Sequence, residues 1–144
     1  MINIYLDTSG SMSEMGKDSA LLYLAKSIED YWSFKGINTT IFTLDGNVIK
    51  NLKFIKYVND IKLDTNNIKS NSILLSDGLF YSEKEYIFDI AVSIGIDRDT
   101  TNLKKISTKV FSSDNILAGL EYLLFENNLL PSNITSKEDD EDEW

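Results

Sequence analysis

Residues 2–12 read Ile-Asn-Ile-Tyr-Leu-Asp-Thr-Ser-Gly-Ser-Met, a short apolar run followed at once by a polar loop. The run from Ile2 to Leu6 does not alternate cleanly between apolar and polar residues, which is typical of a strand covered on both faces. The loop that follows, Asp7 to Met12, is rich in acidic and hydroxyl side chains. Binding residues of α/β sheets lie just beyond the carboxyl ends of the strands, so the junction at Asp7 is a candidate site.

Other strand-like segments extend this pattern along the chain. Ile73–Leu75 and Ile90–Ile96 are apolar runs of the same kind, and both predict buried strands. Ile37–Leu44 is rich in β-branched residues and ends at Asp45-Gly46, a strong turn signal. We therefore expect Val48–Phe54 to return as an antiparallel hairpin partner at the edge of the sheet.

Helical spacing marks the segments between these strands. The first helix is predicted between the strands at Ile2–Leu6 and Ile37–Leu44, with Gly36 as its C-terminal stop. Its apolar face consists of Leu21, Leu24, Ala25, Ile28, Tyr31 and Trp32, while Lys17 and Lys26 are placed off that face. A short helix is predicted near Thr101–Ile106, before a strand at Lys109–Phe111, and a longer helix from about Asn115 to Phe125.

The predicted order is strand, helix, strand, strand, an uncertain segment, strand, short helix, strand, helix, strand, helix. This order indicates an α/β fold: a doubly wound, mostly parallel, Rossmann-like sheet flanked by helices, with one antiparallel edge hairpin and a shortened middle segment. The chain of 144 residues suits one domain, predicted over residues 1–131. Residues 132–144 are polar and acidic and are predicted to form a disordered tail.

Composition excludes several kinds of site. The chain has no cysteine and no histidine, so a metal would have to be held by oxygen atoms, which favours Mg²⁺ or Mn²⁺, with Ca²⁺ as an alternative. The formal net charge of -9 argues against nucleic acid and anionic membranes as partners. No signal peptide is evident and no apolar run reaches the ~18 residues that cross a bilayer. We therefore expect a cytoplasmic protein.

A second polar loop, Ser76-Asp77-Gly78, follows the strand predicted at Ile73–Leu75. If the two strands are neighbours, Asp7 and Asp77 face one another across a small cleft, beside the hydroxyls of the first loop. Asp7, Ser9 and Ser11 are alternate residues, so one turn can point all three inward while Gly10 relieves crowding. Two carboxylates and two hydroxyls suit a hard divalent cation.

The block Asp7-Thr8-Ser9-Gly10-Ser11 resembles the Asp-x-Ser-x-Ser signature of the von Willebrand factor A (vWA) family, its metal-ion-dependent adhesion site (MIDAS). The helix after it, Ile73–Gly78, Val92–Ile96 and the segment from Leu103 to Phe111 are similar to that family's blocks in the same order. The likeness covers roughly residues 1–125.

The resemblance implies a ligand set and a role. Ser9 and Ser11 would bind the metal directly, Asp7 and Asp77 would act through water or from the outer shell, and a threonine would complete the site. Thr65 is the only threonine in the 51–72 segment, with Ser70 and Ser72 as rival donors. The implied function is a protein–protein interaction module, an adaptor or regulatory subunit that binds a partner's Asp or Glu through the metal. Such modules commonly serve larger complexes, for example AAA+ ATPase systems.

Other interpretations compete with this one. Asp7 is also explained as a capping or turn residue, and Asp77-Gly78 as a strand-ending turn. The site could be degenerate, leaving a structural scaffolding subunit. An Mg²⁺-dependent phosphohydrolase with Asp7 as nucleophile is less favoured, since such enzymes typically carry a second acid where this chain has Ser9. Asp97-Arg98-Asp99 is interpreted as a solvated loop, or else as the rim of the site, and the tail ending in Trp144 as a solubilising extension or a partner anchor.

Overall fold

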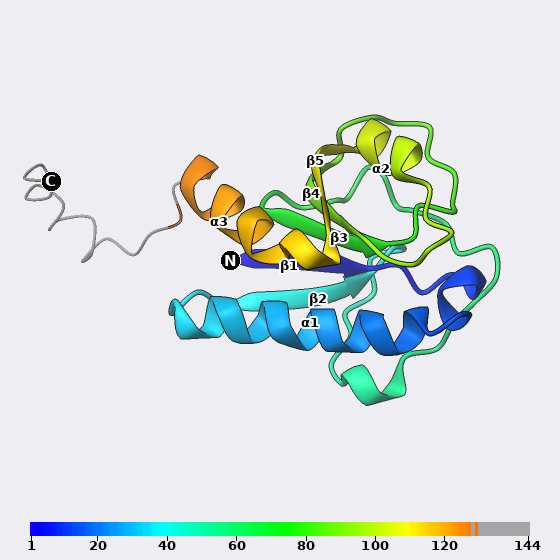
Figure 1. Cartoon of the computed structure of the whole chain (residues 1–144), viewed down its shortest axis with the longest axis horizontal. Coiled ribbons are helices and arrows are strands. Elements are labelled where there is room, and N and C mark those ends of the chain that lie inside the picture. Colours follow the sequence, from blue (N-terminus) through cyan, green and yellow to red (C-terminus); the bar gives the residue numbers. More distant parts are fainter. Residues whose placement is uncertain (128, 130–144) are drawn as a thin grey trace, which may run out of the picture.

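The computed structural model describes residues 1–127 and 129. Its strands form a single five-stranded sheet (Figure 1). All neighbouring strands in the sheet are parallel. In spatial order they are β2 (Thr39–Thr43), β1 (Ile2–Leu6), β3 (Ser72–Ser76), β4 (Phe88–Ser93) and β5 (Ser107–Ser112). The sequence-based expectation of an α/β fold with a largely parallel sheet flanked by helices is therefore confirmed, and this arrangement is compatible with a Rossmann-like fold.

Helices cover both faces of this sheet (Figure 1). The first helix, α1 (Lys17–Phe34), and the last, α3 (Ile116–Glu126), pack on one face. The short α2 (Thr100–Ile106) packs on the other. Three 3₁₀ turns complete the regular structure: η1 (Gly10–Ser13), η2 (Leu52–Phe54) and η3 (Ser113–Asn115). No helix among the residues described is both long and apolar enough to cross a membrane.

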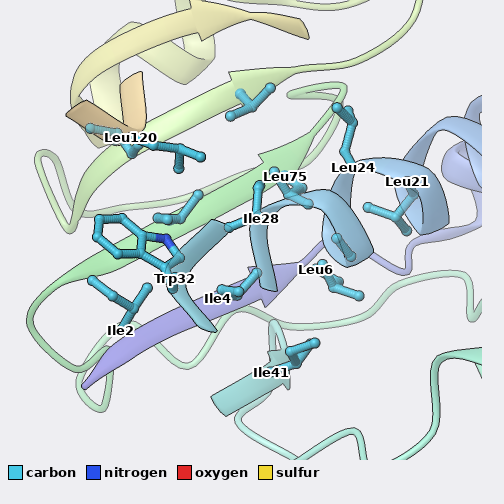
Figure 2. Close-up of a cluster of buried hydrophobic side chains, with 14 of the residues drawn as sticks. Ile2, Ile4, Leu6, Leu21, Leu24, Ile28, Trp32, Ile41, Leu75 and Leu120 are labelled. Atoms are coloured by element: carbon cyan, nitrogen blue, oxygen red, sulfur yellow. The ribbon is translucent and has the colours of Figure 1, made fainter. Parts of the chain in front are cut away.

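The larger core lies between the sheet and the helices α1 and α3. Trp32, which is fully buried, sits at the end of α1 beside Ile2 and Ile4 of β1 (Figure 2). Alternate residues of a strand point to opposite faces, which is why Ile2, Ile4 and Leu6 all belong to this core. Their intervening neighbour Tyr5 belongs to the opposite core, where its ring stacks on Phe42 at 5.0 Å.

The prediction that Val48–Phe54 forms an antiparallel edge hairpin is wrong. Gly46 turns the chain after β2, but Val48 forms only an isolated antiparallel bridge with Phe42. Asn51 then accepts a hydrogen bond from the Lys53 backbone N–H with its side chain and begins η2, which takes the chain away from the sheet edge. A turn signal fixes where the chain reverses, but a hairpin also needs a second strand that stays in register.

The segment between β3 and β4 also differs from expectation, because residues 77–87 contain no helix. The side-chain amide of Asn102 on α2 donates to the carbonyls of Gly78 and Phe80, at 2.8 and 2.7 Å. Lys105 Nζ donates to the carbonyl of Ser82 at 3.0 Å. These bonds satisfy the loop's carbonyls without helical structure.

The connections create a switch point in the sheet. From β1 the chain crosses through α1 to β2 on one side, and it then returns to β3 on the other side of β1. The reversal of strand order therefore falls between β1 and β3. In doubly wound sheets of this kind, ligands bind at the carboxyl ends of the strands that flank the reversal. Asp7 follows β1 and Asp77 follows β3, so both lie at this point.

Candidate functional site

The two acidic loops converge because β1 and β3 are direct neighbours. Leu6 pairs with Leu75, and the backbone N–H of Asp7 donates to the carbonyl of Leu75 at 3.0 Å. Asp7 and Asp77 are both fully buried, and each follows the last residues of its strand. The juxtaposition that the sequence pattern predicted is therefore present in the fold.

Asp7 is held rigidly through both carboxylate oxygens. The backbone N–H of Ser9 donates to Oδ1 at 2.9 Å, and the hydroxyl of Ser76 donates to Oδ2 at 2.6 Å. Burial raises the pKa of Asp7 above its usual value, against the hydrogen bonds from Ser76 and Ser9, and the charge of Asp77 adds to the rise. No lysine or arginine in the described part of the chain forms an ion pair with Asp7. The carboxylate is therefore buried without a cation.

Ser9 and Ser11 face the same space as the aspartates. Their hydroxyl oxygens lie 3.3 Å apart, and Ser11 Oγ donates to Asp77 Oδ2 at 2.8 Å. Between them, Gly10 begins η1, and a Cβ atom at this position would collide with the side chain of Asn59. Gly10 thus relieves crowding in the loop, as the sequence analysis predicted.

Asp77 receives donors from three directions. The backbone N–H of Leu79 donates to Oδ1 at 3.0 Å, which is a local turn contact. The other oxygen, Oδ2, accepts from Ser11 and also from Lys17 Nζ, at 2.9 Å. Asp77 is thus a turn residue that also contacts the side chains of Ser11 and Lys17.

Lys17 is a residue of the candidate site that the sequence analysis missed. We predicted it to lie off the apolar face of α1, yet its side chain is only 1% exposed. Its ammonium contacts Asp77 and both oxygens of Asp97, at 2.9 to 3.0 Å. Burial lowers the pKa of Lys17, but the bonds and charges of the two aspartates outweigh it, so the pKa is raised and the group is cationic.

A spacing signal for Lys17 was present in the sequence. Lys17, Leu21, Leu24 and Ile28 recur at intervals of four, three and four, so Lys17 continues the apolar stripe of α1 by one turn. A lysine in such a stripe needs a buried acid, and the sequence offered Asp77 and Asp97 at strand ends. Asp97 is partly exposed, and its ion pair with Lys17 lowers its pKa. It therefore lies on the rim of the site, which was the alternative interpretation of the Asp97-Arg98-Asp99 loop.

The candidates for the third hydroxyl are separated by the fold. Ser70 and Ser72 lie at the amino end of β3, the opposite edge of the sheet from Asp77: the Ser70 carbonyl accepts from Asn3, and Ser72 Oγ accepts from the Asp89 backbone N–H. Thr65 instead lines the same cavity as Ser9. Of the three, Thr65 alone lies at the same edge of the sheet as Ser9 and Asp77.

The cavity beside Ser9 has a volume of about 560 Å³. Its walls come from two loops, with Lys62 and Thr65 on one side and Leu79 and Tyr81 on the other. Leu79 and Tyr81 are 42% and 77% exposed, so two large apolar side chains lie at the solvent-facing wall of the cavity.

The donor set fits a hard divalent cation. Neighbouring oxygen ligands of an octahedral Mg²⁺ ion, each ~2.1 Å from it, lie about 3 Å apart. The separation of 3.3 Å between Ser9 Oγ and Ser11 Oγ, the two hydroxyls expected to bind directly, is close to this value. Within residues 1–127 and 129, no three His, Cys, Asp or Glu side chains are grouped to hold a metal. Hydroxyl ligands would therefore be essential.

No protein-family model matches the chain, and a search of curated proteins finds no match either.

The predicted tail, residues 132–144, lies outside the residues that the structure describes.

Proposed function

We propose that this protein is a divalent-metal-dependent interaction module of the vWA type, which binds an acidic residue of a partner protein. The observation that carries the proposal is the buried carboxylate of Asp7, which has no cationic partner among the residues described and lies at the switch point of the sheet. An uncompensated buried charge is costly, and a bound cation would remove that cost.

Each side chain of the cluster has a role in the proposal. Ser9 and Ser11 would hold Mg²⁺ or Mn²⁺ through their hydroxyls, and Thr65 would add a third from across the cavity. Asp7 and Asp77 would act from the outer shell, because hydrogen bonds already hold their oxygens. With few direct carboxylate bonds, the bound ion stays electrophilic and supplies a position for a partner's Asp or Glu.

The cavity beside Ser9 gives a partner protein a place to dock next to the site. Its wall carries Asp60 and Glu83 as well as Lys62, so the attraction for a partner's acidic residue would come from the bound ion. Exposed Leu79 and Tyr81 would supply apolar contact next to it. An adaptor or regulatory role in a larger cytoplasmic complex, such as an AAA+ ATPase system, is the biological form of the proposal.

The direct test is calorimetric titration with Mg²⁺ and Mn²⁺. The wild type should bind one ion saturably, while Asp7→Ala and Ser9→Ala should lose binding. Ser19→Ala, an exposed serine of α1, is the matched control and should bind like the wild type. Co-purification of a partner in the presence of Mg²⁺, lost in EDTA and in Ser9→Ala, would extend the result from metal to partner.

A scaffolding subunit without metal is the second candidate, and the buried Lys17 favours it. An ammonium on Asp77 already neutralises one of the two buried carboxylates. Saturable metal binding by the wild type would exclude this candidate, and its absence, with and without an acidic partner, would favour it. The burial of Asp7 and its two hydrogen bonds support a binding role over that of a phosphohydrolase nucleophile.

A further inference from the structure

Lys17 is a buried cation inside the candidate site that the proposed function does not use. It begins α1, and its stem passes over Gly95, where a Cβ atom would lie only 2.6 Å from Lys17 Cδ. The ammonium has three N–H groups. Its three acceptors are Asp77 Oδ2, Asp97 Oδ1 and Asp97 Oδ2. Because all of them belong to the two aspartates, Lys17 is directed at the cluster itself.

The ammonium contacts the same oxygen that orients the metal-facing hydroxyl. Asp77 Oδ2 accepts from Ser11 at 2.8 Å and from Lys17 at 2.9 Å. A divalent ion bound at Ser11 would therefore meet a second positive charge a few atoms away. Charges repel strongly at such separations in a buried site, where water screens them little. The two cations compete for Asp77.

Asp97 offers the ammonium a second position. Its two carboxylate oxygens both accept from Lys17, whereas Asp77 contributes one. Asp97 is 34% exposed and Asp77 is fully buried, so Asp97 lies on the solvent side of the pair. An ammonium that left Asp77 would still be paired with Asp97, so the displacement would not leave a positive charge unpaired.

We propose that Lys17 is a displaceable internal cation that holds Asp77 in the metal-free protein and sets the metal affinity of the site. Binding of the ion moves the ammonium from Asp77 onto Asp97. This inference rests on the proposed function, because it concerns the same metal site. It assigns to Lys17 and Asp97 a regulatory role that the Asp-x-Ser-x-Ser pattern does not contain.

The test is the Mn²⁺ affinity, measured by calorimetry, of the wild type, Lys17→Met and Lys62→Met. Lys17→Met keeps the unbranched stem and removes the buried charge, so it should bind Mn²⁺ about 10–100-fold more tightly. Lys62→Met removes a positive charge from the cavity wall without touching Asp77, and its affinity should stay within about threefold of the wild type.

A second pair of variants should change the Mn²⁺ affinity in the opposite direction, and neither variant replaces a fully buried residue. Asp97→Asn removes the second position of the ammonium, so Lys17 should remain on Asp77 and Mn²⁺ binding should weaken. Asp18→Asn removes a carboxylate next to Lys17 in sequence that does not contact it, and it measures the plain loss of one negative charge. Asp97→Asn should bind at least about fivefold more weakly than Asp18→Asn.

The outcomes separate the two proposals. If the wild type binds Mn²⁺ and Lys17→Met binds no more tightly than Lys62→Met, Lys17 is not a competing cation, and the proposed function stands alone. If only Lys17→Met binds, the competition is established and the wild type is not a metal-dependent module. If neither binds, both proposals fall. Should Lys17→Met not fold, the Asp97→Asn and Asp18→Asn pair decides, and equal affinities overturn the inference.

Discussion

Ser11 Oγ donates a hydrogen bond of 2.8 Å to Asp77 Oδ2, although the two residues are 66 positions apart in the chain. The contact exists because β1 and β3 are neighbours and both loops leave the sheet at the same edge. It ties the hydroxyl of one loop to the acid of the other. The preorganised cluster therefore depends on this bond as much as on either residue alone.

Removal of the Ser11 hydroxyl should affect both stability and metal binding. Ser11→Ala takes a donor from a buried carboxylate, which should lower the free energy of unfolding by about 1–3 kcal/mol. It should also weaken Mn²⁺ binding at least tenfold, because the site loses a ligand. Ser13 donates to the Gly10 carbonyl on the exposed side of the same loop. Ser13→Ala should cost less stability and leave Mn²⁺ affinity unchanged, and equal losses in the two variants would contradict the assignment.

Most of the fold could be predicted from the sequence because local signals agreed with the long-range structure. The apolar runs at Ile2–Leu6 and Ile73–Leu75 are buried on both faces, and so is the third run from Ile90 to Ile94, although Ile96 is exposed. The helices α1, α2 and α3 cover the two faces. The convergence of Asp7 and Asp77 followed from one further assumption, that their strands are adjacent. That assumption is confirmed by the pairing of β1 with β3.

The features that sequence reasoning missed are those that depend on distant partners. Lys17 was assigned to the polar side because a lysine is rarely buried, and its burial depends on Asp77 and Asp97. The hairpin after Gly46 failed because Asn51 redirects the chain. The loop around Thr65 has no hydrophobic period, so its path is set by tertiary contacts such as the bond from the Asp64 backbone N–H to the Leu44 carbonyl.

The pH dependence of stability should report the burial of Asp7. Its pKa is raised in the folded chain, so the folded protein binds a proton at this group more readily than the unfolded chain does. The contribution of Asp7 to stability is therefore highest below the unfolded pKa of ~3.9 and falls as the pH rises through the folded pKa. Asp7→Asn removes this dependence.

Urea unfolding in EDTA, from pH 4 to pH 7, measures the effect. The stability of Asp7→Asn relative to the wild type should increase over this range and then level off. Addition of Mn²⁺ at pH 7 should stabilise the wild type and leave Asp7→Asn unchanged, because ligand binding to the folded state adds to stability. A stability difference that is flat with pH, or that decreases, would show that burial does not raise the pKa of Asp7.

The third hydroxyl of the site can be identified by comparing Thr65 with Ser72. Thr65→Val is nearly isosteric and removes the hydroxyl at the cavity that Ser9 also lines, so Mn²⁺ affinity should fall about tenfold. Ser72→Ala removes an acceptor for the Asp89 backbone N–H at the far edge of the sheet. It should lower stability by about 1–3 kcal/mol without changing Mn²⁺ affinity. Unchanged binding in Thr65→Val would leave the site with Ser9 and Ser11 as its only hydroxyl ligands.

Asn102 should hold Asp77 in place without touching it. Its amide spans the carbonyls of Gly78 and Phe80, and the residue between these two, Leu79, donates its N–H to Asp77 Oδ1. Asn102→Ala leaves two carbonyls without this donor, so stability should fall by about 1–3 kcal/mol. The loop should open more often, and the Leu79 amide should exchange its hydrogen faster.

The matched control for this change is Thr101→Ala, one position away on the exposed side of α2. Thr101→Ala should leave both stability and exchange within error of the wild type. In Asn102→Ala alone, the amides of residues 77–81 should exchange faster and the Mn²⁺ affinity should fall. Faster exchange without weaker binding would mean that the position of Asp77 does not limit metal affinity. Because Asp77 Oδ2 contacts both Ser11 and Lys17, a displaced Asp77 must alter both contacts, so the two readouts should not separate.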